Sequence, residues 1–163
     1  AKPVVAAVNG AAFGAGCEVA VACDFRIAGS SAVFCENWIE MGAMPPLGGL
    51  FLLPRLIGLE RASDMVMRAT KIDGPRAVEI GLATLSVDDA ILRETAMTFA
   101  KDLASKPGAA MAAIKQGLRR SMDNHLTSEW EFYVNTQAIL LAGPDFSENV
   151  DRINRLIRGK SPK

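Results

Sequence analysis

A glycine-rich segment near the start of the sequence, residues 9–18, has the residue types needed to hold an oxyanion beside a carboxylate. Gly14 and Gly16 allow a tight turn and a close approach of the backbone to a ligand, while Ala15 keeps its side chain small. Free N–H groups at the start of the following helix would face a developing negative charge. Glu18 comes one turn later, so the segment predicts an acid/base group next to an oxyanion hole.

The spacing of these residues excludes three common glycine motifs. No Gly-Lys-Ser/Thr follows, so the segment is not a Walker loop, and Val19 and Ala20 stand where a dinucleotide fingerprint would have its third glycine. The pair Gly10 and Gly14 is not a membrane-packing motif, because Glu18 interrupts the apolar run. The plain alternative is a tight strand-to-helix connection with a solvated Glu18.

The elements that would position this segment alternate between strands and helices. Residues 3–8 form a short β-branched run that predicts a buried strand leading into the turn. After it we expect a helix at 16–23, strands at 25–28 and 32–35, and a buried helix that ends at Pro54. Further helices are expected at 59–68, 75–81, 88–105, 108–122, 126–141 and 145–157. In the helix at 88–105 the expected core stripe comprises Ile91, Ala96, Phe99, Ala100 and Leu103.

The composition of the chain argues against several classes of function. The 163 residues carry 18 basic and 18 acidic side chains, and this balance argues against a nucleic-acid or membrane-surface partner. No apolar run approaches a membrane span. Cys17, Cys23 and Cys35 lack CxxC spacing and histidine partners, so we expect reduced thiols in a cytoplasmic protein and no metal site. His125, the single histidine, is expected at the surface or at a helix cap.

Several strings of the sequence, taken in order, resemble the signature of the enoyl-CoA hydratase/isomerase (crotonase) superfamily. They lie at residues 2–10, 14–18, 23–28, 32–34, 53–58 and 77–83. The resemblance implies an α/β, crotonase-like (ClpP/crotonase) fold with a layered β-sheet core and surrounding helices. Residues 1–87 would form the C-terminal part of this core with the oxyanion-hole turn, and residues 88–163 a helical trimerisation region.

The same resemblance implies that other strands precede residue 3. In the family, several N-terminal strands and helices come before the strand matched by residues 3–8. The resemblance therefore implies that these N-terminal elements are missing from this sequence, which corresponds to the C-terminal two-thirds of the domain. One of the two oxyanion N–H groups, and much of the surface for the adenine end of coenzyme A, would come from that region.

The resemblance assigns roles to residues of the glycine-rich segment. Glu18 falls on the first of two catalytic glutamates of the hydratases, and Ala15 on the residue whose backbone N–H donates the second oxyanion hydrogen bond. Gly14 and Gly16 are expected to contact the substrate.

The second hydratase glutamate has no direct match in this sequence. It should lie four residues before the glycine matched by Gly42, where this chain has Trp38. Glu36 and Glu40 flank this position, and a small shift of the loop would let Glu40 substitute; the alternative is that both are solvent-facing acids. Trp38, Gly42 and Pro46 are expected at the substrate site. Pro46 also stands near where a related dehalogenase has its nucleophilic aspartate, which argues against that activity.

The function implied is that of an acyl-CoA thioester enzyme of the hydratase/isomerase family, which stabilises an enolate in the oxyanion hole and uses Glu18 as acid/base. Coenzyme A would be part of the substrate, with no separate cofactor, and the protein would be a homotrimer or hexamer. Two alternatives stay open. One is an acyl-CoA decarboxylase or hydrolase of the same fold, because Trp38 replaces the second glutamate. The other is a catalytically idle fragment or oligomerisation subunit.

Overall fold

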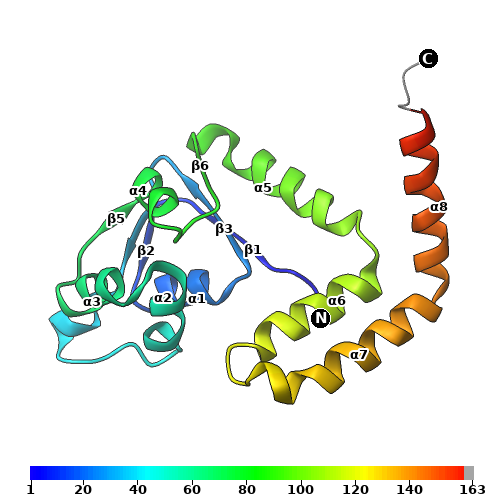
Figure 1. Ribbon diagram of the computed structural model, residues 1–163. Coiled ribbons are helices and arrows are strands. Elements are labelled where there is room, and N and C mark those ends of the chain that lie inside the picture. The colour runs from blue at the N-terminus through cyan, green and yellow to red at the C-terminus, as the bar shows by residue number, and fades with distance from the viewer. Residues whose placement is uncertain (160–163) are drawn as a thin grey trace. The chain divides into compact units, whose positions relative to one another are not determined.

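The computed structural model describes residues 1–159 (Figure 1). The chain divides into two compact units. The first is Pro3–Leu103, and the second comprises the residues from Ala104 onward together with Ala1–Lys2. Within the described residues, no helix combines the length and the apolar character that crossing a membrane requires.

The unit Pro3–Leu103 contains two small sheets (Figure 1). The first has the order β1-β3-β6 and is parallel throughout; its strands are β1 (Val5–Val8), β3 (Phe25–Gly29) and β6 (Leu85–Val87). The second has the order β2-β4-β5; its strands are β2 (Ala11–Phe13), β4 (Val33–Cys35) and β5 (Ile72–Asp73). β2 runs parallel to β4, and β5 antiparallel to it. The strands expected at 3–8, 25–28 and 32–35 are confirmed, whereas β2 lies inside the glycine-rich segment, where no strand was predicted.

Five α-helices and one 3₁₀ helix accompany these sheets. They are α1 (Ala15–Ala22), η1 (Asn37–Met41), α2 (Gly49–Ile57), α3 (Leu59–Met67), α4 (Gly74–Glu79) and α5 (Asp89–Ala104). The prediction that the helix after residue 49 ends at Pro54 is wrong, because α2 continues through Pro54 to Ile57. Leu53 and Ile57 are both buried on one face of α2, so core packing on either side of the proline offsets the one backbone hydrogen bond that its ring removes.

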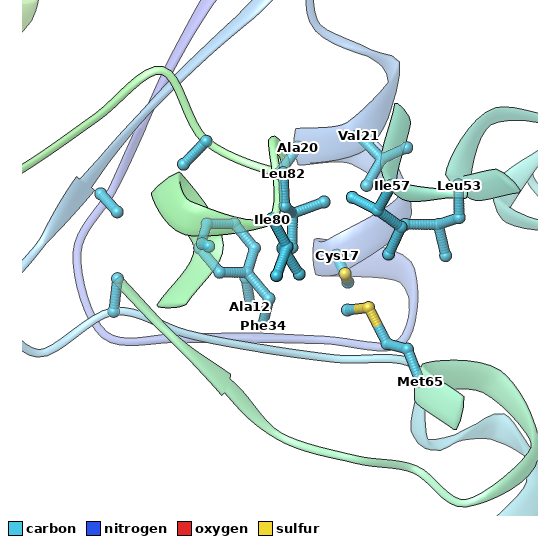
Figure 2. Close-up of a cluster of buried hydrophobic side chains, with 14 of the residues drawn as sticks. Ala12, Cys17, Ala20, Val21, Phe34, Leu53, Ile57, Met65, Ile80 and Leu82 are labelled. Atoms are coloured by element: carbon cyan, nitrogen blue, oxygen red, sulfur yellow. The ribbon is translucent and has the colours of Figure 1, made fainter. Parts of the chain in front are cut away.

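The core of this unit lies where α1, α2, α3 and the segment after α4 meet, as Figure 2 shows. Its buried side chains include Cys17, Phe34, Leu53, Met65 and Leu82.

A buried arginine fixes the C-terminal end of α1 beside β3. Arg26 Nη1 donates to the carbonyl oxygens of Ala20 at 3.1 Å, Val21 at 3.2 Å and Cys23 at 2.7 Å. Its Nε donates to the carbonyl of Leu82. These bonds satisfy carbonyls that the end of a helix leaves without partners, and they hold α1 in register with the sheet.

Helix α5 packs within the sheet-containing unit. The Phe99 ring meets Phe25 of β3 edge to face, with ring centroids 5.0 Å apart. The prediction that Ile91 belongs to the core stripe is wrong, because Ile91 is 49% exposed and Leu92 is buried instead. This packing explains why the two compact units divide after Leu103 and not at the predicted boundary of residue 87.

The second unit is helical and contains α6 (Gly108–Arg120), α7 (Leu126–Ala142) and α8 (Pro144–Gly159), as expected. The α6–α7 connection is held by Glu129, which is 1% exposed. Its carboxylate accepts from Arg120 Nε at 2.6 Å, Arg120 Nη2 at 2.9 Å and Asn124 Nδ2 at 2.8 Å. The Arg120 side chain holds the pKa of Glu129 below its usual range. His125 is exposed at the N-cap of α7, in agreement with the prediction. The last four residues of the predicted region 88–163 lie outside the described residues.

Candidate active site

Gly14 is the N-cap of α1 and makes the sharp turn from β2 into this helix. Its φ of 50° and ψ of −118° are accessible to glycine but strained for other residues. Its N–H donates to the carbonyl of Cys35 at 2.9 Å, which ties the turn to the end of β4. A Cβ at this position would lie 3.3 Å from Asn37 Oδ1 and 3.4 Å from Trp38 Cε2. Backbone conformation and the adjoining indole therefore both require glycine here.

The first turn of α1 presents free backbone donors. Ala15 and Gly16 are exposed, and a Cβ at Gly16 would meet nothing within 4 Å. Within residues 1–159, neither of their N–H groups has an acceptor, as expected for the first residues of a helix. The positive end of the helix dipole adds to the attraction for an anion.

Glu18 lies one turn into α1 and its side chain is buried, with 1% of the residue exposed. Its Oε1 accepts hydrogen bonds from the N–H groups of Leu47 and Gly49, both at 2.8 Å. Its Oε2 has no hydrogen-bond partner among the described residues. Because Gly49 begins α2, the start of a second helix stabilises the carboxylate and holds one of its oxygens in place.

Gly49 must be a glycine for this contact to exist. A Cβ there would lie 3.1 Å from Glu18 Oε1, 3.2 Å from Glu18 Cγ and 3.3 Å from Pro45 Cβ. The loop that carries Leu47 and Gly49 therefore approaches Glu18 as closely as a backbone can.

Trp38 and Glu36 complete the buried surroundings of the turn. The indole of Trp38, on η1, lies against Gly14, and its buried Nε1 has no partner among the described residues. Glu36 is 0% exposed and neither of its carboxyl oxygens has a partner in the described part of the chain.

Burial and charge raise the pKa values of several groups at this site. Desolvation by burial raises the pKa of Glu36 to about 7; the adjacent Cys17 thiol opposes the rise, the charge of Glu18 adds to it, and the Trp38 indole N–H opposes it. The thiol and the indole lie beside Glu36 without forming hydrogen bonds of good geometry. Burial also raises the pKa values of Cys17 and Cys35, so both remain neutral thiols, and all three cysteines are free.

The remaining predicted site residues, Glu40, Gly42 and Pro46, are exposed to solvent. Glu40 is exposed on η1, where its charge acts on Cys35. Gly42 is exposed and ends η1 with a φ of 69°. Pro46 is exposed, whereas the preceding Pro45 is buried near Gly49. The roles of Glu40, Gly42 and Pro46 stay predictions.

The alternative that Glu36 and Glu40 are both solvent-facing acids is wrong for Glu36, which is buried, whereas Glu40 is exposed. The structure also adds two contributors that the sequence did not single out, the N–H groups of Leu47 and Gly49. The sequence did contain an indication that Glu36 is buried. Alternate residues of a strand share a face, and Glu36 follows the fully buried Phe34 by two positions.

A separate hollow of about 1040 Å³ lies along α3, β5 and α4 and shares no lining residue with this site. Of its basic residues, Arg68 pairs with Asp64 and Arg76 pairs with Glu79. No group of side chains among residues 1–159 has the composition to hold a metal ion.

Comparison with known proteins gives a consistent match over most of the chain. The sequence model of the enoyl-CoA hydratase/isomerase family matches residues 1–152. A short-chain-enoyl-CoA hydratase of Clostridium acetobutylicum is 40% identical over 121 residues, which cover 74% of this chain and 46% of that protein. A 1,2-epoxyphenylacetyl-CoA isomerase of Escherichia coli is 34% identical over 149 residues, which cover 91% of this chain and 57% of that protein.

A solved structure supports the same match. The crystal structure of an enoyl-CoA hydratase from Bacillus anthracis gives a TM-score of 0.89 at 31% identity, covering 94% of this chain and 59% of that one. The chain spans about half the length of the curated relatives it matches.

Proposed function

Because the chain belongs to the enoyl-CoA hydratase/isomerase family, we propose that it acts on an acyl-CoA thioester by stabilising the enolate oxygen of the substrate. The observation that carries this proposal is the buried Glu18 carboxylate. One of its oxygens is held by two backbone N–H groups, and the other has no partner among the described residues. The carboxylate lies one helical turn from the open N–H of Ala15.

The backbone N–H of Ala15 would donate to the thioester oxygen as that oxygen gains negative charge. A fixed donor at the positive end of a helix stabilises the charge without reorganisation, and removing one such donor costs about 3 kcal/mol of transition-state stabilisation in comparable sites. Gly14 and Gly16 leave room for the thioester to approach this N–H.

Glu18 would exchange a proton with a carbon of the acyl chain or orient a water molecule, using its free Oε2. Since Oε1 is already held by Leu47 and Gly49, the carboxylate enters the reaction with its orientation fixed. The proposed chemistry needs no resident cofactor, because coenzyme A is part of the substrate.

Hydration or isomerisation of an acyl-CoA is the reaction that we propose first, because the two relatives named above are an enoyl-CoA hydratase and an acyl-CoA isomerase. Trp38 favours a second candidate, decarboxylation or hydrolysis of an acyl-CoA. Its indole lies against Gly14 where the resemblance places a second carboxylate, and it gives the site an apolar wall. In a site of low dielectric, one carboxylate and an oxyanion hole suffice for enolate chemistry.

Parallel assays with crotonyl-CoA and a malonyl-type CoA separate these candidates. Loss of crotonyl-CoA with formation of the hydroxyacyl product supports hydration, and release of CO₂ or free coenzyme A supports the second candidate. Glu18→Gln should reduce the rate by about 10²- to 10⁴-fold, whereas Glu60→Gln, which changes an exposed carboxylate of α3, serves as the matched control. Activity that survives Glu18→Gln would remove Glu18 from its assigned role.

A thermal shift with an acyl-CoA tests whether the site binds at all. Binding to the folded chain must raise the melting temperature, by an amount that grows with ligand concentration. A melting temperature that stays constant at high acyl-CoA concentration would instead support a catalytically idle subunit.

We also propose that α6, α7 and α8 mediate assembly into a homotrimer or hexamer. These helices expose large apolar side chains, including Leu126, Trp130, Ile139, Ile153 and Leu156. Such apolar side chains on a helical surface are typical of interaction sites. Sedimentation equilibrium should give three or six copies, and a monomer at micromolar concentration would contradict the proposal.

A further inference from the structure

Glu36 is a buried acid for which the chemistry proposed above has no use. It follows β4 directly and is 0% exposed, and both of its carboxyl oxygens are buried without a partner among the described residues. A carboxylate in that state would carry a full charge with neither solvent nor hydrogen bonds. Burial without partners therefore favours the neutral form of such an acid.

The neighbours of Glu36 do not supply a compensating positive charge. From α1 it faces the Cys17 thiol, whose pKa burial and Glu36 raise, and the carboxylate of Glu18. From η1 it faces the indole N–H of Trp38.

The other charged groups of this region act on the thiol of Cys35. Glu40 raises the pKa of Cys35 and Lys71 lowers it, both after the larger effect of burial. The Lys71 ammonium also lies over the ring of Phe13, 5.7 Å from its centroid.

Glu18 and Glu36 complement each other as hydrogen-bonding groups. Glu18 keeps a buried acceptor, Oε2, that has no donor among the described residues, while its Oε1 is held by two backbone N–H groups. A neutral Glu36 supplies a carboxyl O–H donor, and neither of its oxygens has a partner among the described residues. The charge of Glu18 opposes ionisation of Glu36, and two carboxyl groups that interact in a desolvated site do not both ionise, so one proton belongs to the pair.

We propose that Glu36 and Glu18 form a pair of buried carboxyls that holds one proton, with Glu36 as the protonated member and as a positioning residue for Glu18. The effect on catalysis rests on the proposed function, whereas the shared proton does not. With the proton present, the site carries the single negative charge of Glu18. Loss of that proton breaks the O–H bond of Glu36 and leaves two negative charges beside the place where the enolate would form, which disfavours the transition state.

Infrared spectroscopy tests the shared proton without any substrate. The C=O stretch of a protonated carboxylic acid should be present in the wild-type protein at neutral pH and should be absent from Glu36→Gln. Glu18→Gln should move the loss of this band to lower pH, because it removes a negative charge that opposes ionisation of Glu36. Glu60→Gln, at an exposed position of α3, should leave the band unchanged.

Two results would overturn the pairing. One is a wild-type spectrum without a protonated carboxyl band at neutral pH, which needs no variant and so does not depend on any substitution folding. The other is a band whose loss occurs at the same pH in Glu18→Gln as in the wild type.

The pH dependence of the rate tests the positioning role. If the proton of Glu36 is required, kcat/KM for an acyl-CoA should fall by about 100-fold between about pH 7 and pH 9, and the fall should be less than about threefold in Glu36→Gln. Equal falls in both proteins would contradict the positioning role. A protein that shows the infrared band but turns over no acyl-CoA would contradict the proposed function and leave the pair intact.

Discussion

Replacing Glu36 with glutamine should change how the stability of the unit Pro3–Leu103 depends on pH. Burial raises the pKa of Glu36 from 4.5 to about 7 in the folded chain, where the residue is 0% exposed. Between these two pH values the folded chain holds a proton that the unfolded chain has released. The free energy of unfolding must therefore fall as the pH rises through this window, and the fall is complete above about pH 7.

The size of the effect follows from the width of the window. One pKa unit corresponds to about 1.4 kcal/mol, so the rise from 4.5 to about 7 corresponds to at most about 3 kcal/mol of unfolding free energy. Glutamine has nearly the same shape as glutamic acid and does not titrate. We expect the stability of Glu36→Gln relative to the parent protein to increase by up to this amount across the window.

Urea unfolding at a series of pH values measures this difference. Trp38 fluorescence reports on the unit that contains Glu36, provided that Trp130, which is 62% exposed in the other unit, is first replaced by phenylalanine. Glu60→Gln in the same background controls for the loss of an exposed carboxylate. The reasoning is refuted if the stabilities of Glu36→Gln and its parent run parallel from pH 4.5 to 7, because Glu36 would then be as ionised in the folded chain as in the unfolded one.

Three further substitutions test how the site is held. Gly14→Ala places a Cβ 3.4 Å from the Trp38 ring at a φ of 50° and should lower the unfolding free energy by about 1–3 kcal/mol, measured by chemical denaturation; an unchanged stability would contradict the need for glycine. Gly49→Ala places a Cβ 3.1 Å from Glu18 Oε1 and should reduce kcat by about tenfold or more with a much smaller change in melting temperature; full activity would show that this contact does not orient Glu18. Arg26→Met removes the donor from four backbone carbonyls. It should lower the free energy of unfolding, measured in urea, by about 3 kcal/mol or more. A decrease below about 1 kcal/mol would show that these carbonyls find other partners.

Local patterns in the sequence predicted most of the fold. The strand at 3–8 follows from its β-branched run, and the positions of most helices follow from hydrophobic periodicity and from glycine and proline at their ends. The layered core was predicted from the family resemblance. The errors occur where tertiary packing overrides a local rule. Pro54 does not end α2 because Leu53 and Ile57 are buried on both sides of it. The core face of α5 contains Leu92 and not Ile91, since contact with β3 sets the rotation of the helix.

The candidate site was predictable only in part. The turn at Gly14 and the carboxylate of Glu18 are local features, and the structure places them one helical turn apart, as their spacing requires. The anchoring of Glu18 by Leu47 and Gly49 joins residues 29 and 31 positions away in sequence. No periodicity could indicate such a contact. The burial of Glu36 was indicated by its alternation with Phe34, whereas the packing of the Trp38 indole against Gly14 is a property of the tertiary structure.

The N-terminal ends of α1 and α2 differ in what their N–H groups bind, and this difference affects which chemistry the site can support. Among the described residues, the N–H groups of Ala15 and Gly16 at the start of α1 have no acceptor, while those around the start of α2 donate to Glu18 Oε1. Under the proposed function, an incoming thioester oxygen would therefore not compete with Glu18 for donors, and both positions would be set by backbone geometry. The side chains at 36 and 38 then act on the charge and polarity beside both positions. We therefore expect two features to decide between water addition and chemistry with a single carboxylate. One is the number of protons that Glu18 and Glu36 hold, and the other is the apolar indole of Trp38.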